Sequence, residues 1–323
     1  MTDEQRMLAE MADDLFSRLG SNADIETDWS AIEDVALTGL LLGEDQGGFG
    51  GSWEDATIVF RLAGYHAVAL PIVEAAIAAA IIGKSEGRAT LASRAKGELS
   101  GDRFTGEVSG ICYGTGACSI VAPLPGGGSF IFDAKSALLK EGESLAGERR
   151  DATRLEDCPV IVSDTDVFAL GALARVSQIA GALDAALEKS VAYVNERQQF
   201  GRPLAKFQAV QQNLATFACE AAAANCAAMG AAQAMSSKGE ALYEIAAAKL
   251  RANRAIEKGT AVAHQSHGAI GFTREYSLHP LTRRLWSWRS EFGTDAYWSA
   301  QLGERIVSRG ADQFWPDLTA LTG

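Results

Sequence analysis

Two separate segments of this 323-residue chain combine residues that suit an anionic ligand. The first contains Arg197, and a guanidinium presents a planar fork that binds phosphate oxygens through two parallel hydrogen bonds. The second contains Gln265 and then a glycine-bearing turn at residues 268–271, directly after a long alanine-rich helical pattern. Glycine at a helix end permits the left-handed conformation needed there and leaves backbone N–H groups open to an anion. These two segments are therefore the first candidates for a phosphate-binding site.

Each signal also has a plain structural alternative. An arginine at the end of its own helix is favoured by the helix dipole, and most helices that end on glycine bind nothing. His264 and His267 lie one helical turn apart, a spacing that suits a metal, but no suitably placed carboxylate or cysteine accompanies them. We predict no metal site, and we expect His267 to face the bound ligand or a subunit contact.

A glycine-dense loop at residues 43–51 is a further candidate for a phosphate cradle. The Lys-Ser/Thr pair of a P-loop does not follow it, so a tight connection between helices is the favoured interpretation. The five cysteines form an odd set without the spacing of metal ligands, which predicts reduced and mostly buried thiols in a cytoplasmic protein.

The composition excludes several classes of function. The net charge of -12 argues against nucleic-acid binding, which needs clustered lysine and arginine. The acidic, amphipathic start of the chain does not read as a signal peptide, and the apolar run at residues 75–83 is too short to cross a bilayer. We therefore expect a cytoplasmic protein with neither a membrane nor a nucleic acid as partner.

Hydrophobic periodicity divides the chain into three units that would position these residues. Helical patterns at 3–20, 28–42, 53–64 and 71–82 predict a helical unit over residues 1–92. Short β-rich runs between glycines predict a small antiparallel sheet or barrel over 93–166. Residues 167–323 return to helical patterns, at 174–197, 208–235, 244–264 and 302–311. The expected fold class is α+β, mainly α, and the alanine-rich last unit is typical of a tightly packed bundle.

Several motifs resemble those of the acyl-CoA dehydrogenase family. Arg197, Phe200 and Gly201 match its R-x-x-F-G signature, and Gln208 follows at the family spacing. Gln265 begins a match to its Q-x-x-G-G-x-G signature, and weaker matches run through most of the chain. The resemblance implies an N-terminal helical domain, a small and here shortened β-domain, and a C-terminal four-helix bundle that binds FAD and makes subunit contacts.

In this family the two signatures hold FAD across a subunit interface. The resemblance implies that Arg197, Phe200 and Gln208 meet the pyrophosphate and adenosine end of the cofactor. It places a second group of residues on the same cofactor from a neighbouring subunit: Gln265, Gly268, Ala269 and Gly271. Thr294 completes the implied set of cofactor-binding residues. Ala269 stands where the family usually has a second glycine, and its methyl group narrows the approach of the cofactor.

The catalytic base of the family has no obvious counterpart. The family reaction removes a proton from the carbon α to a thioester while a hydride leaves the β-carbon, so one carboxylate must face the flavin. Most members carry this Glu in an E-G-T triplet, which an ungapped count from Tyr276 places at Phe292-Gly293-Thr294. Other members carry it on the helix before R-x-x-F-G, where this chain has Gly171. Neither residue accepts a proton.

Glu291, one position before Phe292, is the remaining candidate base. On a loop its carboxylate would reach the substrate, but on a helix end it would point about 100° away. The alternative is a solvated or salt-bridged glutamate near Arg289. The backbone N–H of Phe292 still suits the thioester oxygen, because that contact needs no side chain. The family's T-E-x-x-x-G-S-D loop, which touches flavin and substrate, has no evident counterpart between Ile82 and Ser109.

The resemblance therefore implies an FAD-dependent subunit that takes part in the α,β-desaturation of a CoA thioester. Short chains of this kind resemble subunits of heterotetramers that act on steroid-derived CoA thioesters, so a longer partner would supply the catalytic Glu. The alternatives are a self-sufficient homo-oligomer that uses Glu291, and a non-catalytic scaffold without flavin. The family also implies an electron-transfer flavoprotein as the electron acceptor.

Overall fold

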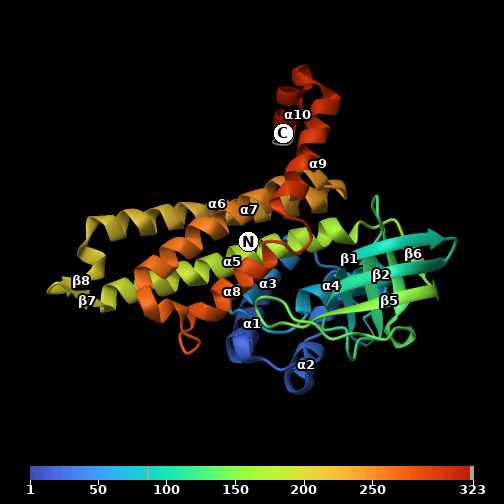
Figure 1. Ribbon diagram of the computed structural model, residues 1–323, viewed down its shortest axis with the longest axis horizontal. Coiled ribbons are helices and arrows are strands. Elements are labelled where there is room, and N and C mark those ends of the chain that lie inside the picture. The colour runs from blue at the N-terminus through green and yellow to red at the C-terminus, as the bar shows by residue number, and fades with distance from the viewer. Residues whose placement is uncertain (86, 321–323) are drawn as a thin grey trace.

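The computed structural model describes residues 1–85 and 87–320. Figure 1 shows an elongated molecule with a helical bundle toward one end and a β-sheet at the other. The last two helices project from the body as an arm, which carries the described end of the chain. The described chain is mainly helical with one small six-stranded sheet and a two-stranded hairpin, and this confirms the predicted fold class.

The chain begins with a helical unit whose helices are α1 (Asp3–Leu19), α2 (Ile25–Asp34), α3 (Trp53–Tyr65) and α4 (Ile72–Ile82). Reciprocal capping boxes start α1 at Thr2 and α3 at Ser52, which is the expected use of these residues. Helix α4 is apolar on all sides and is largely buried, as its sequence predicts. The predicted helix 28–42 is wrong in its bounds, because Ala36 adopts a left-handed φ of 52° that ends the helical path.

The glycine-dense loop at 43–51 folds back onto the residues that precede it. The N–H groups of Phe49 and Gly51 donate to the carbonyls of Gly39 and Leu40 at 3.0 and 2.9 Å. A Cβ built on Gly48 would overlap the carbonyl of Leu42, so this position requires glycine. These N–H groups serve the chain itself, which fits a tight connection between helices.

The middle of the chain forms a six-stranded sheet in the order β5-β2-β1-β3-β4-β6. Its strands are β1 (Ala89–Ser100), β2 (Arg103–Cys112), β3 (Ser119–Pro123), β4 (Ser129–Asp133), β5 (Arg150–Pro159) and β6 (Ile161–Ser163). The expectation of a purely antiparallel sheet is wrong at one pairing, because β1 and β3 run parallel from Ala89 beside Ser119. A separate aromatic core supports the sheet, with Phe104 stacked on Phe130 at 4.3 Å between ring centroids.

The last unit is a bundle of α5 (Val167–Glu196), α6 (Gln208–Lys238), α7 (Leu242–His267) and α8 (Leu278–Trp288). Helix α5 is the central member and contacts α3, α6, α7 and α8. Gly181 of α5 packs against the backbone of α3, where any Cβ would overlap the carbonyl of Arg61. The strands β7 (Gln198–Gln199) and β8 (Arg202–Pro203) form a hairpin at the end of the bundle that lies away from the sheet (Figure 1).

The predicted last helix at 302–311 has different bounds. Helix α9 (Asp295–Arg309) begins earlier, at the cap provided by Thr294, and α10 (Phe314–Ala320) follows a turn at Gly310. The expectation that the cysteines are mostly buried holds for Cys112 and Cys158, whereas Cys219 and Cys226 are exposed on α6.

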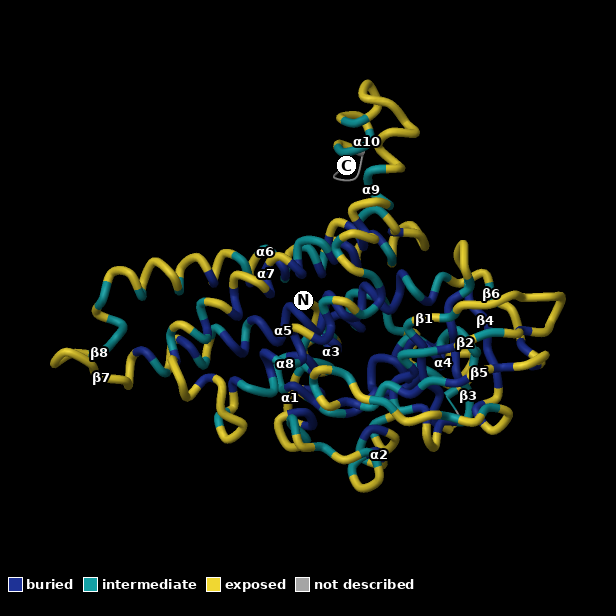
Figure 2. The backbone as a smooth tube through the Cα atoms, in the orientation of Figure 1, coloured by how far each residue is buried: buried dark blue, intermediate teal, exposed yellow. Residues whose placement is uncertain are grey.

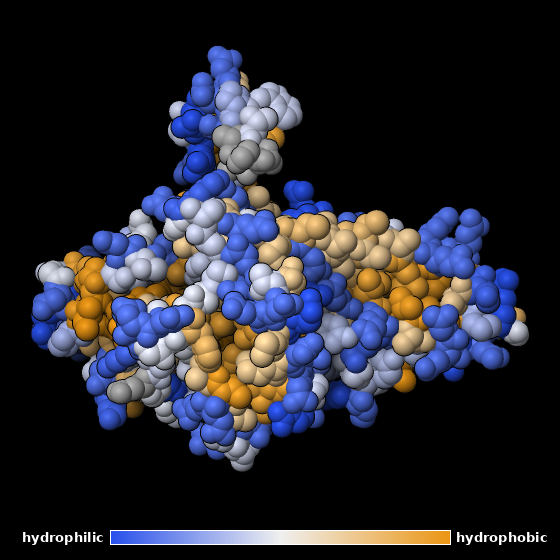
Figure 3. All heavy atoms as spheres, turned by 180° about the vertical axis from the view of Figure 1, so that it is seen from behind, coloured by the Kyte–Doolittle hydropathy of each residue, from blue (hydrophilic) through white to orange (hydrophobic). Residues whose placement is uncertain are grey.

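Among the described helices, α5 and α6 are long and apolar enough to cross a bilayer by length and composition alone. The apolar window of α5 is 89% buried inside the bundle, as is typical of a core helix. The window of α6 is only 28% buried, and Figure 2 shows exposed positions along this helix. Hydrophobic residues reach the surface over the bundle half of the molecule in the rear view (Figure 3).

Candidate active site

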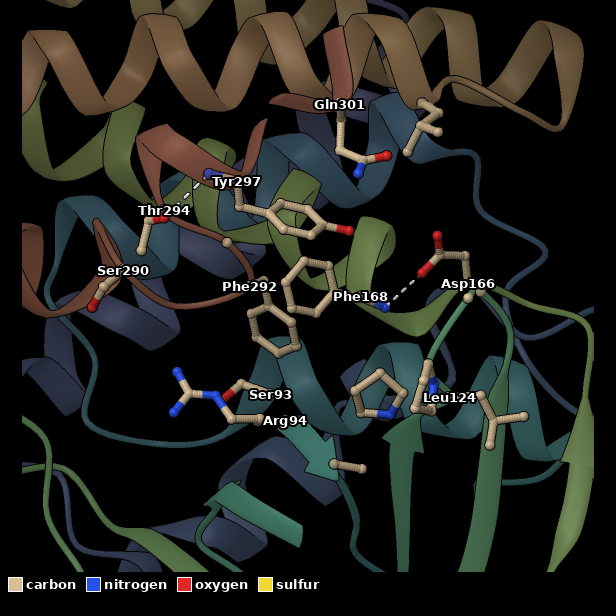
Figure 4. A pocket seen from close by; sticks show the side chains of 17 residues that line it. Ser93, Arg94, Leu124, Asp166, Phe168, Ser290, Phe292, Thr294, Tyr297 and Gln301 are labelled. Carbon is tan, nitrogen blue, oxygen red and sulfur yellow. Dashed lines mark hydrogen bonds between the residues drawn. The ribbon is translucent and has the colours of Figure 1, made fainter. Parts of the chain in front are cut away.

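A cavity of about 670 Å³ lies between the sheet and the start of the bundle (Figure 4). Strand β1 contributes residues 93–95, and the glycine-rich turn between β3 and β4 contributes residues 123–127. The opposite wall comes from the first turn of α5, from the loop between α8 and α9, and from α9 itself. This volume lies within the range of cofactor and small-molecule sites.

Aromatic side chains form one wall of this cavity. The ring of Phe168 lies 6.0 Å from that of Phe292 and 5.1 Å from that of Tyr297, both in edge-to-face arrangements. Figure 4 shows these three rings grouped at the centre of the view, with Thr294 and Ser290 to one side. Asp166 lies at the other side and uses its carboxylate to cap α5, accepting from the N–H groups of Phe168 and Ala169.

Phe292 and Gly171, the two positions predicted for the base, lie in contact with each other. A Cβ built on Gly171 would overlap the Phe292 ring, so these two residues fill one volume together. Phe292 has a left-handed φ of 51°, and Trp298 Nε1 donates to its carbonyl at 3.0 Å. Gly293 follows with a φ of 104°, and any Cβ there would overlap the Trp298 indole. The contacts of Gly171, Gly293 and Trp298 therefore fix the conformation of this loop with an apolar side chain at position 292.

Glu291 points away from this aromatic wall into a set of basic side chains. Arg150 donates to both of its carboxylate oxygens at 3.1 and 3.2 Å, and Arg175 donates at 2.8 Å. Burial alone would raise the pKa of Glu291, but the two guanidiniums outweigh burial and lower it to about 2. A carboxylate held in this way is ionised near neutral pH and is a weak proton acceptor.

The salt-bridged alternative for Glu291 is thus the observed one, although its partners differ from the expected Arg289. Arg289 pairs instead with Asp295 at 2.8 Å. The network around Glu291 extends further, because Arg175 also pairs with Glu74 of α4. Arg150 and Arg284 both pair with Glu148, so this buried network joins the first helices, the sheet and the bundle.

A buried lysine holds the loop that carries these residues. Lys249 of α7 is fully buried, and its ammonium donates to the carbonyls of Trp288 and Arg289 at 3.0 and 2.9 Å and to Asn253. Asn253 in turn donates to Arg289 and, at 2.7 Å, to Asp295. Neither residue was predicted from the sequence, although Lys249 lies on the same helical face as the buried Ile245 and Ala252.

Most of the predicted cofactor-binding residues lie at the far end of the bundle, where α5 and α7 both end and Tyr193 stacks on His267, whereas Thr294 lies apart from them. Arg197, Phe200 and Gln208 are exposed where α5 ends and α6 begins, and Phe200 is 83% exposed with a left-handed φ of 53°. Gln265, Gly268 and Ala269 are exposed where α7 ends, while Gly271 is buried. Thr294 lies instead at the cavity, where it caps α9.

Two details of the α7 terminus differ from expectation. The N–H of Gly268 bonds the carbonyl of His264 and so closes the helix, which removes one donor from the predicted anion site. His267, which we expected to face a ligand or a subunit contact, is buried within the chain, where it stacks on Tyr193 at 4.6 Å and bonds the carbonyl of Ala263.

The cavity with Thr294 and the residues at the far end of the bundle are separated by the length of α5. This helix has 30 residues, and a rise of 1.5 Å per residue gives about 45 Å from the cavity at its start to Arg197 after its end. A single dinucleotide does not bridge that distance within one chain.

The sequence of the bundle matches an established domain family. Residues 162–307 match the family described as "Acyl-CoA dehydrogenase, C-terminal domain". The chain is 29% identical over 275 residues to the acyl-CoA dehydrogenase FadE34 of Mycobacterium tuberculosis, covering 79% of this chain but only 38% of that protein. It is 26% identical over 298 residues to the acyl-CoA dehydrogenase IpdE2 of the same organism, covering 90% and 87% of the two chains.

Solved structures of the same fold cover almost the whole chain. The ChsE4-ChsE5 complex from Mycobacterium tuberculosis superposes with a TM-score of 0.83 at 18% identity, over 96% of this chain and 99% of the other. A steroid acyl-CoA dehydrogenase, the Tcur3481-Tcur3483 G363A variant, gives a TM-score of 0.85 at 22% identity, over 95% and 98%. With its signature residues and its three-part fold, the chain resembles the acyl-CoA dehydrogenase family, and residues 162–307 match the C-terminal domain of that family.

Proposed function

We propose that this chain is one subunit of an FAD-dependent acyl-CoA dehydrogenase that desaturates a CoA thioester between its α- and β-carbons. In this proposal a longer subunit of the same family supplies the catalytic carboxylate. The complex is a heterotetramer in the cytoplasm that passes electrons to an electron-transfer flavoprotein. FAD, when bound, accepts the hydride that leaves the β-carbon.

The observation that carries the proposal is the interlock of Phe292 with Gly171. The two positions predicted for the base hold residues without a proton acceptor, which pack against each other. The nearby carboxylate of Glu291 forms ion pairs with Arg150 and Arg175. Phe292 is only 4% exposed, so its ring stays packed in this wall. A phenyl ring carries no proton acceptor. Proton abstraction would then take place in the partner subunit.

The residues at the far end of the bundle fit the pyrophosphate and adenosine end of FAD. Arg197 is exposed there, and a guanidinium suits a pyrophosphate through paired hydrogen bonds. The exposed ring of Phe200 and the exposed amides of Gln208 and Gln265 suit an adenosine, which offers a flat base and hydrogen-bonding groups. These residues would hold the cofactor while the partner's chain surrounds its reactive ring, which is consistent with the separation of about 45 Å along α5.

The fold similarity supports the heteromeric form and the substrate class. One structure of the same fold is a complex of two named chains, ChsE4 and ChsE5, and another is a steroid acyl-CoA dehydrogenase. We therefore propose a bulky, steroid-derived acyl group for the substrate of the complex.

Co-expression tests this proposal directly. The chain is purified alone and after co-expression with a longer acyl-CoA dehydrogenase from the same organism, and each sample is assayed with a steroid side-chain CoA thioester. We expect FAD absorbance near 450 nm and turnover only from the mixed tetramer, whose mass is measured under native conditions. Full dehydrogenase activity from this chain alone would contradict the proposal and favour a self-sufficient homo-oligomer that uses Glu291. A mixed tetramer without flavin would favour a non-catalytic scaffold subunit.

A further inference from the structure

The ammonium of Lys249 is covered by the loop between α8 and α9, residues 289–294. Its three N–H groups donate to Asn253 and to the carbonyls of Trp288 and Arg289, at 3.0, 3.0 and 2.9 Å. Trp288 ends α8 and Arg289 begins the loop, and the next residue, Ser290, is exposed to solvent. An outward movement of this loop would therefore admit water to the ammonium.

The charged groups around Lys249 balance one another without it. They belong to α4, α5, α8, α9, the loop and the start of β5, and they form ion pairs among four arginines and four carboxylates: Arg150, Arg175, Arg284 and Arg289 with Glu74, Glu148, Glu291 and Asp295. Glu257, on the same helix as Lys249, lies 4.0 Å from Arg289 at the surface. Within residues 1–85 and 87–320, no carboxylate forms an ion pair with Lys249. Its charge is therefore additional to those that the network neutralises.

A buried ammonium without a paired carboxylate is costly, because neutral acceptors replace only part of the water that it loses. Lys249 is 0% exposed, and burial lowers its pKa to about 7. Both the ammonium and the amine are consequently populated near neutral pH. The two forms differ in how much they gain from water, so they differ in how strongly they favour the closed loop.

The closed loop also contains a backbone conformation that opening would relax. Phe292 has a φ of 51°, a left-handed value that is unfavourable for a bulky side chain. Its position is fixed by the contact with Gly171 and by the bond from Trp298 Nε1 to its carbonyl. Figure 4 shows Phe292 of this loop between Ser290 and the ring of Phe168. The loop thus combines a strained residue with a buried charge beneath it.

We propose that Lys249 makes the opening of the loop between α8 and α9 dependent on pH. The ammonium favours the open loop, because opening returns water to the charge. The amine favours the closed loop, because it gains less from water and keeps two of the three hydrogen bonds. The carbonyl of Arg289 also accepts from Asn253 at 3.1 Å, so it is the acceptor that loses Lys249 at the least cost. This device goes beyond the proposed function, since it needs neither flavin nor a partner subunit.

Linkage gives the direction of the effect. The closed state has a pKa of about 7 at Lys249, and a solvated lysine has the ordinary value of 10.5. The open state therefore binds the proton more tightly, and opening becomes less favourable as the pH rises from about 7 toward 10.5. Below about pH 7 both states are protonated, so the opening equilibrium is independent of pH there.

Amide hydrogen exchange of the purified chain tests this inference. The amides of Arg289 and Trp298 report on the loop, because each donates at 3.1 Å to a carbonyl, that of Leu285 or Thr294. After division by the intrinsic exchange rate at each pH, their protection should be constant from pH 6 to 7 and rise at least about tenfold between pH 7 and 9. Lys249→Met should abolish this rise. Lys258→Met, at an exposed position of the same helix, is the matched control and should keep it.

A lysine resonance provides a second measurement that needs no variant to fold well. In the unchanged chain labelled at the lysine Cε carbons, one NMR signal should titrate with a midpoint about three units below the others. That signal should be missing from Lys249→Met and present in Lys258→Met. Loop protection that does not change above pH 7 in the unchanged chain, or lysine signals that all titrate near 10.5, would overturn the inference.

Discussion

At the scale of single residues, the chemistry of the site depends on what surrounds Glu291. Its carboxylate makes three hydrogen bonds with two arginines that lie 141 and 116 residues away in the chain. Removing this carboxylate would leave two buried guanidiniums without their counter-charge, which destabilises the native state. Glu291 thus differs from a catalytic base, which needs a pKa near the working pH.

Glu291→Gln should therefore lower the free energy of unfolding at pH 7 by about 3–5 kcal/mol, as measured by urea denaturation. The native pKa of about 2 lies below the ordinary value of 4.5, so this stabilisation is present above pH 4.5 and is lost as the pH falls toward 2. The difference between the variant and the unchanged chain should shrink over that interval. Glu143→Gln, an exposed neighbour, is the control. Loss of turnover with unchanged stability would instead identify Glu291 as a base.

At the scale of elements, the loop between α8 and α9 is positioned by α7. Lys249 and Asn253 bond the last carbonyls of α8, and Asn253 also bonds Asp295 in the first turn of α9. This arrangement satisfies helix-end carbonyls that would otherwise lack donors. It also holds Phe292 in its left-handed conformation beside the cavity.

Burial lowers the pKa of Lys249 to about 7 from 10.5, although Glu291 and Asp295 oppose the shift. The native state therefore releases a proton that the unfolded chain keeps up to pH 10.5. The contribution of this group to stability should rise with pH from about 7 to about 10.5 and be constant below that interval. Lys249→Met should remove this rise from the pH dependence of unfolding, whereas Lys258→Met, at an exposed position of the same helix, should keep it. Identical pH dependences in the Lys249→Met variant and the unchanged chain would contradict the assignment.

The elements also mark the limit of what local patterns predict. Hydrophobic periodicity predicts the long helices and the position of the sheet. Counting along the family motifs predicts that Phe292 and Gly171 stand where a catalytic glutamate is expected. The parallel pairing of β1 with β3 is not predicted, because neither strand carries a local signal for its neighbour. The partners of Glu291 and the contacts of Lys249 depend on segments that meet only in the folded chain.

At the scale of the whole molecule, the two ends of α5 carry different groups of candidate residues. The cavity lies at its start, and Arg197 lies about 45 Å away beyond its end, at a surface where the exposed alanines of α6 also begin. An arginine that binds a phosphate in this position is useful only when another subunit brings the rest of the cofactor. In the proposed function, the distance between the two ends of α5 makes assembly necessary for cofactor binding.

Arg197→Ala should consequently reduce the FAD affinity of the mixed tetramer by at least tenfold, because a charge-assisted hydrogen bond to phosphate contributes about 1.5–3 kcal/mol. The measurement is the FAD retained after gel filtration, read near 450 nm and divided by the protein concentration. Arg254→Ala is the matched control, since Arg254 is exposed on α7 and is not among the predicted cofactor contacts. The native mass should stay that of the tetramer in both variants. Full retention of FAD by Arg197→Ala would show that the far end of the bundle does not hold the cofactor, and the separation along α5 would then need another explanation.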